Sequence, residues 1–327
     1  MKSPDEQHLH LLDNVSFRPV FIIGDHRSGT TLMHQLLAET GGFNFVTAYH
    51  VIKYQQILSD CLQKNVEASR RELQQDFLKL GLTDRIIDNV PATPDLPVEY
   101  GFVFASVNNR RPKLNEQSLP QFVELCKKIQ FVGQPDRPLL LKNPWDVLRF
   151  AEIKTYFPEA RFVFIHRHPI SVLNSQLKAV QSVMAARNGF LAMLAPWYKR
   201  LYEHPLQLSA VRLLAGPPFR LWERLLAVHM IRVADYFVNH IGSLTPGDHI
   251  SVKYEELCKD PDATMANILG FLRVPVRNQQ SYRSRIEPRP PKLLKQVCQK
   301  YREISGRLAP YLHYHGYEVE PAFLRQL

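Results

Sequence analysis

The sequence predicts an α/β fold in which a central parallel β-sheet is flanked by helices. Short apolar runs that fit buried strands occur at 20–23, 138–142, 161–167 and 249–254, with helical patterns between them. Strands that alternate with helices are typical of parallel sheets with right-handed crossovers. No internal repeat or low-complexity linker interrupts the chain, so a single domain, 1–327, is expected.

The first half of the chain contains the first strand and several helical patterns. A polar lead-in ends at Pro19, and strand 20–23 is followed by a turn and by a helix that ends at Gly41-Gly42, as C-terminal glycines do. The elements expected next are a strand at 43–48, helices at 49–62 and 67–80, an extended proline-rich loop at 91–97 and a helix at 116–130.

The second half repeats the alternation with one irregular interval. Segment 185–219 is apolar and aromatic, but its four prolines predict irregular structure. The elements expected around it are strand 138–142, helix 145–157, strand 161–167, helix 170–184, helix 220–241, strand 249–254, helix 260–272 and a tail helix at 291–308.

The turn after the first strand has the pattern of a phosphate-binding loop. Gly24 to Thr31 reads G-D-H-R-S-G-T-T between a strand and a helix, so backbone N–H groups at the helix N-terminus are expected to face an anion. A nucleoside triphosphatase loop continues with Lys after its second glycine, whereas this chain has Thr30 and carries Arg27 within the loop. The loop therefore predicts phosphate binding without the usual lysine of phosphoryl transfer.

A second cationic group follows the third predicted strand. Arg167 ends this strand, and Ser175 lies eight residues further on, within the next helix. Ligands of open parallel sheets bind at the carboxyl ends of the strands, where both Arg27 and Arg167 are expected. Arginine binds phosphate oxygens in pairs, so two such sites suggest a nucleotide with phosphates at its 3′ and 5′ positions.

The composition is compatible with an anionic ligand and gives no sign of a metal site. The chain has 41 Lys and Arg against 31 Asp and Glu, and its four cysteines lack any metal-binding spacing. Neither a signal-peptide pattern nor a transmembrane run is present, so a cytoplasmic location is expected, without a clean basic amphipathic helix that would indicate a membrane contact.

Three separated motifs together resemble sulfotransferases that use 3′-phosphoadenosine 5′-phosphosulfate (PAPS). The motifs are RSGTTL at 27–32, FIHRHPISVLNS at 164–175 and KYEELCKDPDATMANILGFLRVP at 253–275, and they occur in the family's order. LLLKNPWDVLRFAEIKTYFPEARFV, at 139–163, resembles the family's lysine-containing strand and its approach to the second motif. The resemblance covers 20–50 and 138–275 and implies the P-loop-like sulfotransferase fold.

The resemblance also implies roles for the loop residues. Thr30 and Thr31, with the backbone at Ser28 and Gly29, would hold the 5′-phosphate, and Arg27 would hold the phosphosulfate side. Arg167 and Ser175 would hold the 3′-phosphate. The implied reaction is in-line transfer of a sulfuryl group from PAPS to an acceptor hydroxyl or amine, with no metal.

The candidate catalytic residues lie outside the three motifs. Lys142, at the end of its strand, is a candidate for stabilising charge on the bridging oxygen. Cytosolic family members carry a histidine two residues after this lysine, but Pro144 stands there in this chain. The candidates for the base that accepts the acceptor's proton are therefore Glu99, then His50, and more weakly Asp146.

The acceptor side is expected in 185–241, a helical insert whose apolar and aromatic residues would suit a small-molecule, lipid or glycan acceptor. Two alternatives stay open. A P-loop kinase or NTPase would need the missing lysine, and a non-enzymatic nucleotide-binding or nucleic-acid-binding protein would show a recognisable basic and aromatic module, which is not found. No nucleic-acid partner is expected, and the sequence makes no prediction of the oligomeric state.

Overall fold

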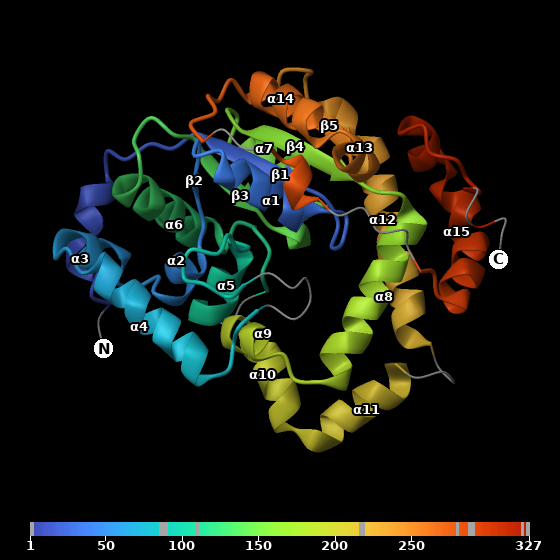
Figure 1. Cartoon of the computed structure of the whole chain (residues 1–327), viewed down its shortest axis with the longest axis horizontal. Helices are drawn as coiled ribbons and strands as arrows, with labels where there is room; N and C mark the ends of the chain where they lie inside the picture. The colour runs from blue at the N-terminus through green and yellow to red at the C-terminus, as the bar shows by residue number, and fades with distance from the viewer. Residues whose placement is uncertain are drawn as a thin grey trace.

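The computed structural model describes residues 3–84, 91–108, 111–215, 220–278, 281–286, 292–321 and 324; the side chains of 106–108 and 215 are not among them. Its centre is a five-stranded parallel sheet in the order β2-β3-β1-β4-β5 (Figure 1). The strands are β1 (Pro19–Ile23), β2 (Asn44–Phe45), β3 (Leu139–Lys142), β4 (Arg161–His166) and β5 (His249–Lys253). The α/β class and the parallel sheet are as predicted.

Each strand of the sheet centre is buried on both faces, which explains the continuous apolar runs in the sequence. Val20, Leu140 and Ile165 pack into a core with helices α1, α13 and α14. Phe21 and Phe164 point the opposite way, into a larger core formed by α6, α7, α8, α12 and α15. Side chains two residues apart share a face, so Lys142 belongs with Leu140 and Arg167 with Ile165 on the α1 side of the sheet.

Helices cover both faces of the sheet, and one group extends away from it. In Figure 1, α8 runs from the sheet to α9, α10 and α11 at the lower edge of the view, and α12 returns beside α8 and α15. The helices are α1 (Thr30–Glu39), α2 (Ala48–Ile52), α3 (Ile57–Leu62), α4 (Val66–Lys79), α5 (Gly101–Asn108), α6 (Leu119–Val132), α7 (Phe150–Tyr156), α8 (Pro169–Ala185), α9 (Gly189–Leu194), α10 (Pro196–Glu203), α11 (Pro205–Ala215), α12 (Leu221–His240), α13 (Tyr254–Lys259), α14 (Pro261–Leu272) and α15 (Lys295–Tyr314), with short 3₁₀ turns at Glu6–Leu12, Pro144–Asp146, Ile241–Ser243 and Arg283–Arg285.

The prediction of irregular structure at 185–219 is wrong for its described part. Residues 189–215 form α9, α10 and α11, and Pro196 and Pro205 begin two of these helices. Proline is tolerated in the first helical turn because the N–H that it lacks would have no helical partner there. Pro196 and Pro205 therefore mark helix starts, and Pro217 and Pro218 lie outside the described residues.

Three further expectations need correction, all in the irregular parts of the chain. The expected helix 49–62 is divided into α2 and α3 by a break at 53–56, and the expected strand 43–48 is only the two residues of β2. The expected helix 145–157 is a 3₁₀ turn followed by α7, and helix α5 was not predicted. These segments are short, so their boundaries depend on tertiary contacts more than on local pattern.

In the described ranges no helix is long and apolar enough to cross a membrane, and no group of three or more metal-ligating side chains gathers. All four cysteines are free thiols.

Candidate functional site

The loop between β1 and α1 adopts the strained, compact geometry of an anion-binding turn. Arg27 and Gly29 have positive φ angles of 71° and 106°. A Cβ on Gly24 would lie 2.7 Å from the Ile165 carbonyl oxygen, so the loop passes directly against the end of β4. The Ser28 hydroxyl donates to the Asp25 carbonyl at 2.8 Å and closes the turn. The first-turn N–H groups of α1, from Thr30 onward, are left at the open end of the helix.

The two predicted arginines and Ser175 lie together at the rim of the sheet. Arg27 Nε donates to Ser175 Oγ on α8 at 3.1 Å, and Arg167 donates to the Arg27 carbonyl at 3.1 Å. The Arg167 guanidinium also stacks over the Tyr254 ring, 4.4 Å from its centroid. A Cβ on Gly29 would lie 2.5 Å from the same ring, so Tyr254 packs between the loop and Arg167.

Lys142 and Glu99 form a buried ion pair beside the loop. Lys142 Nζ lies 2.6 Å from Glu99 Oε1 and 3.1 Å from Thr31 Oγ1, and the two residues are 1% and 6% exposed. Lys142 ends β3, where it pairs in register with Ile22 of β1. The carboxyl ends of β3, β1 and β4 therefore bring a lysine, the loop and an arginine to one edge of the sheet.

Asp25, His26, Gln176 and His229 hold and flank the loop, and none of them was predicted as a site residue from the sequence. The Asp25 carboxylate accepts hydrogen bonds from its neighbour's backbone N–H at 2.7 Å, from Gln176 Nε2 at 3.0 Å and from His229 Nε2 at 3.0 Å. Burial alone would raise the pKa of Asp25, but the hydrogen bond and charge of His229 hold it below its ordinary value. The same contact raises the pKa of His229 against the effect of burial.

His26 lies close to the charged pair. Burial lowers its pKa, and the charges of Asp25, Glu99 and Lys142 also act on it. Its ring meets the Trp145 ring edge-on, with centroids 5.0 Å apart. Asp25 and His26 could have been found from their place in the loop. The contact of Asp25 with His229 of α12 could not, because the two residues are 204 positions apart in the sequence.

The remaining base candidates have structural contacts. His50 is buried in a capping box at the start of α2, where its Nδ1 accepts the Thr47 N–H at 3.2 Å, and burial lowers its pKa to about 3. Asp146 is fully buried, and its oxygens accept from Tyr100 Oη, Asn143 Nδ2 and the Leu114 N–H at 2.6, 2.6 and 2.9 Å. Burial raises the pKa of Asp146 to about 6. Neither His50 nor Asp146 contacts Lys142 in these hydrogen bonds, whereas Glu99 forms an ion pair with it.

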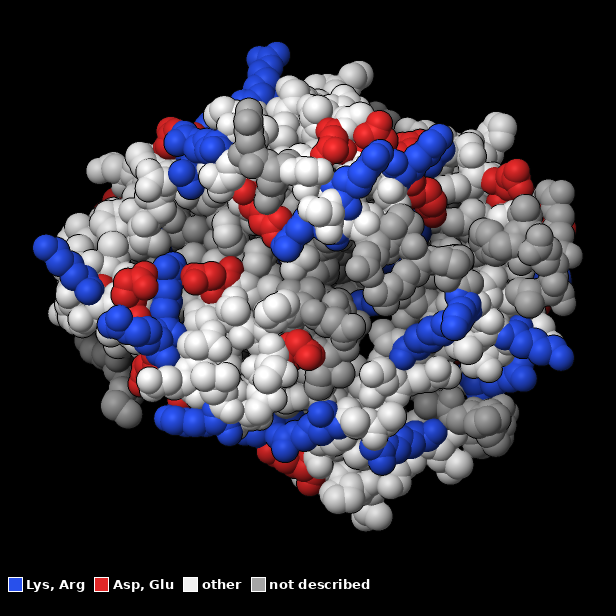
Figure 2. Space-filling view, viewed as in Figure 1, with Lys and Arg blue, Asp and Glu red and all other residues white. Residues whose placement is uncertain are grey.

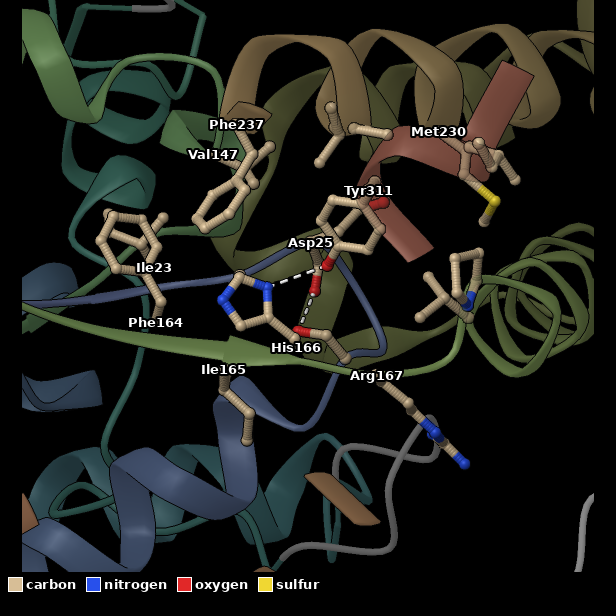
Figure 3. Close-up of a pocket in the computed structure, with 17 residues that line it drawn as sticks. Ile23, Asp25, Val147, Phe164, Ile165, His166, Arg167, Met230, Phe237 and Tyr311 are labelled. Carbon is tan, nitrogen blue, oxygen red and sulfur yellow. Dashed lines mark hydrogen bonds between the residues drawn. The ribbon is translucent and has the colours of Figure 1, made fainter. Parts of the chain in front are cut away.

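A small, mainly apolar cavity adjoins β4, and residues on both faces of the strand, Arg167 among them, contribute to its lining. Figure 3 shows Phe164 and His166 on one side of the strand and Ile165 and Arg167 on the other. His166 Nδ1 is 2.8 Å from the Tyr311 hydroxyl oxygen, and its ring centroid is 3.8 Å from that of His315. Alternation along β4 therefore separates two groups of side chains. One is a packed aromatic cluster of Phe164, His166, Tyr311 and His315, and the other is the cationic rim formed by Arg27, Lys142 and Arg167.

Comparisons with known proteins place this geometry in a family. A family model described as "Sulfotransferase family" matches residues 19–217. The omega-hydroxy-beta-dihydromenaquinone-9 sulfotransferases Stf3 of Mycobacterium bovis and Mycobacterium tuberculosis are each 28% identical over 182 residues, which cover 49% of this chain and 44% of the relative. The match thus spans less than half the length of these relatives.

Solved structures share the fold. The crystal structure of sulfotransferase STF9 from Mycobacterium avium has a TM-score of 0.63 at 15% identity, covering 96% of this chain and 81% of the other. That of STF1 from Mycobacterium tuberculosis H37Rv has a TM-score of 0.54 at 15% identity, covering 86% and 74%. The family model matches more than half of the chain, and this protein therefore belongs to the sulfotransferase family.

Proposed function

We propose that this protein transfers a sulfuryl group from PAPS to a hydroxyl of a lipid-like acceptor and releases adenosine 3′,5′-bisphosphate. The observation that carries the proposal is the cationic rim, in which Arg167 and Lys142 contact a Gly-bounded loop that carries Arg27, all at adjacent strand ends. Family membership favours sulfuryl transfer over the kinase alternative.

The residues at the rim fit a nucleotide with two phosphate groups. In the proposed complex, the loop backbone at Ser28 and Gly29 and the hydroxyls of Thr30 and Thr31 hold the 5′-phosphate. Helix N-termini favour such anions because their N–H groups and dipole point toward the ligand.

The two arginines are assigned to different groups of the nucleotide. Arg27 holds the phosphosulfate side, and Arg167 with Ser175 holds the 3′-phosphate. The contact between Arg27 and Ser175 supports a single continuous site, since it joins the two groups assigned to different ends of the nucleotide.

The buried ion pair supplies the groups that the transfer requires. The acceptor oxygen forms a bond to sulfur while the bond between sulfur and the bridging oxygen of the 5′-phosphate breaks. The acceptor proton passes to the Glu99 carboxylate, and Lys142 stabilises the charge that develops on the bridging oxygen. We place the base at Glu99 because its partner in the ion pair, Lys142, contacts Thr31 of the loop, whereas His50 and Asp146 contact residues outside the loop.

The proposed acceptor class rests on the relatives and on the chain's own composition. The curated relatives are named as sulfotransferases of a hydroxylated menaquinone, which is a lipid-like molecule. The described part of 185–241 in this chain is helical and rich in apolar and aromatic side chains.

The proposal is tested by a transfer screen and a binding comparison. PAPS is incubated with the protein and with lipid-like, small phenolic, glycan and amine acceptors, and mass spectrometry detects a sulfated product. Thermal stability is compared with adenosine 3′,5′-bisphosphate, with ATP and Mg²⁺, and with single-stranded nucleic acid. Stabilisation by the bisphosphate with sulfation of a hydroxyl supports the proposal, stabilisation by ATP and Mg²⁺ alone contradicts it, and bisphosphate binding without any transfer indicates a non-enzymatic binder.

A further inference from the structure

Helix α11 carries an apolar stripe on its outer surface. Leu206, Ala210, Leu213 and Leu214 recur at the spacing of one helix face and are exposed, with Leu206 and Leu213 87% and 63% exposed. Leu208, on the opposite side of the helix, is buried. One side of α11 therefore packs on the core, and a second apolar side faces solvent. Large exposed apolar patches are rare on soluble proteins and mark binding sites.

The surroundings of the stripe are strongly basic. Residues 186–232 contain seven Lys or Arg residues, all of them exposed, and two glutamates, of which Glu223 is buried and Glu203 exposed. In Figure 2, Lys and Arg side chains gather along the lower edge of the molecule, over the region where Figure 1 places α10 and α11. Trp197 of α10, 49% exposed, adds an aromatic side chain to the same segment.

We propose that α10 and α11 form a docking surface for an anionic lipid membrane. Apolar side chains at one face with cations beside them are the composition of helices that lie in the membrane interface, where leucine and tryptophan enter the headgroup boundary and Lys and Arg contact acidic lipids. The charge selects this occupant: an acidic bilayer offers both an apolar layer and negative charge over an extended surface. A second copy of this chain would bring the same cations face to face.

The surface of α10 and α11 also lies away from the sheet (Figure 1), so a membrane bound there would leave the cationic rim open to solvent. Helices α9 to α11 stand at the edge of the molecule, and α8 connects them to Ser175 at the cationic rim (Figure 1). The inference rests on the surface alone and does not depend on the proposed reaction.

Vesicle sedimentation with the full chain tests the proposal. The protein is expected to sediment with phosphatidylglycerol-containing vesicles and to remain mostly in solution with phosphatidylcholine alone, with binding weakened by high salt. Leu206→Glu combined with Leu213→Glu is expected to weaken binding about tenfold or more, and Lys199→Glu with Arg200→Glu to weaken it on anionic vesicles. The matched control is Leu62→Glu, an exposed leucine of α3 (45% exposed) outside this surface, which is expected to bind like the unchanged protein.

Light scattering without lipid separates the outcomes. A stable dimer that Leu206→Glu dissociates would show that the stripe contacts a second copy and would overturn the membrane assignment. Equal binding by the Leu206→Glu/Leu213→Glu variant and the Leu62→Glu control would overturn it as well. Circular dichroism of each variant verifies folding, and nucleotide binding measured in parallel keeps a failure here distinct from a failure of the proposed reaction.

Discussion

Replacing Glu99 by glutamine tests the assignment of the base because the change keeps the size and one oxygen of the side chain and removes its proton affinity. Glu99 Oε1 lies 2.6 Å from Lys142 Nζ in a buried environment. A general base contributes about 10²–10⁴-fold to the rate. Turnover of PAPS with the best acceptor from the screen is therefore expected to fall by this factor, equivalent to about 2.7–5.5 kcal/mol in activation free energy.

Loss of the ion pair must be separated from loss of the base. A hydrogen bond to a buried charged group contributes about 1.5–3 kcal/mol, so Glu99→Gln is expected to lower the free energy of unfolding by about this amount. A domain with the usual stability of about 5–15 kcal/mol remains folded after that loss. The affinity for adenosine 3′,5′-bisphosphate is expected to stay near that of the unchanged protein, since Glu99 is not assigned to the nucleotide.

The chain offers a matched control for the stability effect. Asp5 forms a second buried ion pair with Lys128 at 2.9 Å, and both side chains are 1% exposed. Asp5→Asn is expected to lower stability similarly while leaving kcat unchanged. A Glu99→Gln enzyme with kcat within about threefold of the unchanged enzyme would refute the assignment of the base. Loss of turnover in His26→Asn instead would move the role to that imidazole.

Three further perturbations follow from the geometry of the site and the aromatic cluster. Lys142→Met is expected to reduce kcat about 10²–10³-fold with little change in bisphosphate affinity, measured by product release under saturating PAPS; an unchanged kcat would remove the lysine from the mechanism. Gly29→Ala is expected to lower the free energy of unfolding by about 1–3 kcal/mol, because the position has a φ of 106° and its Cβ would collide with an aromatic ring, and chemical denaturation that shows equal stability would contradict this strain. Burial lowers the pKa of His166 well below its ordinary value and that of His315 to about 4. Both histidines are neutral in the folded protein and protonate more readily when it unfolds. Their contribution to the free energy of unfolding is therefore fully present above about pH 6.5 and is lost as the pH drops toward 4. Denaturation at pH 7.5 and 4.5 is expected to show a smaller loss for His315→Phe than for the unchanged protein, and equal losses would contradict this origin.

The sheet and the loop could be predicted from the sequence because their signals are local. The strands at 20–23, 138–142 and 161–167 are buried on both faces and therefore form continuous apolar runs. In the Gly24–Thr31 loop, Gly29 has a positive φ and Gly24 lies close to the backbone of β4. The positions of these glycines can be read from the sequence. Once the strands are parallel, the strand ends must meet at one edge, which brings Lys142 and Arg167 near the loop.

The remaining features depend on contacts that no local pattern records. Nothing in the proline-rich loop indicates that Glu99 pairs with Lys142, because the two are 43 residues apart in sequence. The His229 contact to Asp25 arises from the packing of α12 against the loop. Helices α10 and α11 were missed because proline in a helical first turn has the same composition as proline in a loop.

Arg167 is proposed to hold the 3′-phosphate of a nucleotide whose 5′-phosphate lies in the loop. Calorimetric affinities of the unchanged protein and of Arg167→Met for adenosine 3′,5′-bisphosphate and for adenosine 5′-monophosphate test it most directly. The unchanged protein is expected to prefer the bisphosphate, and Arg167→Met to bind both nucleotides about equally while its affinity for the monophosphate is retained. If Arg167→Met keeps the full preference for the bisphosphate, or weakens both nucleotides by the same factor, the arginine does not recognise the 3′-phosphate and the account is wrong.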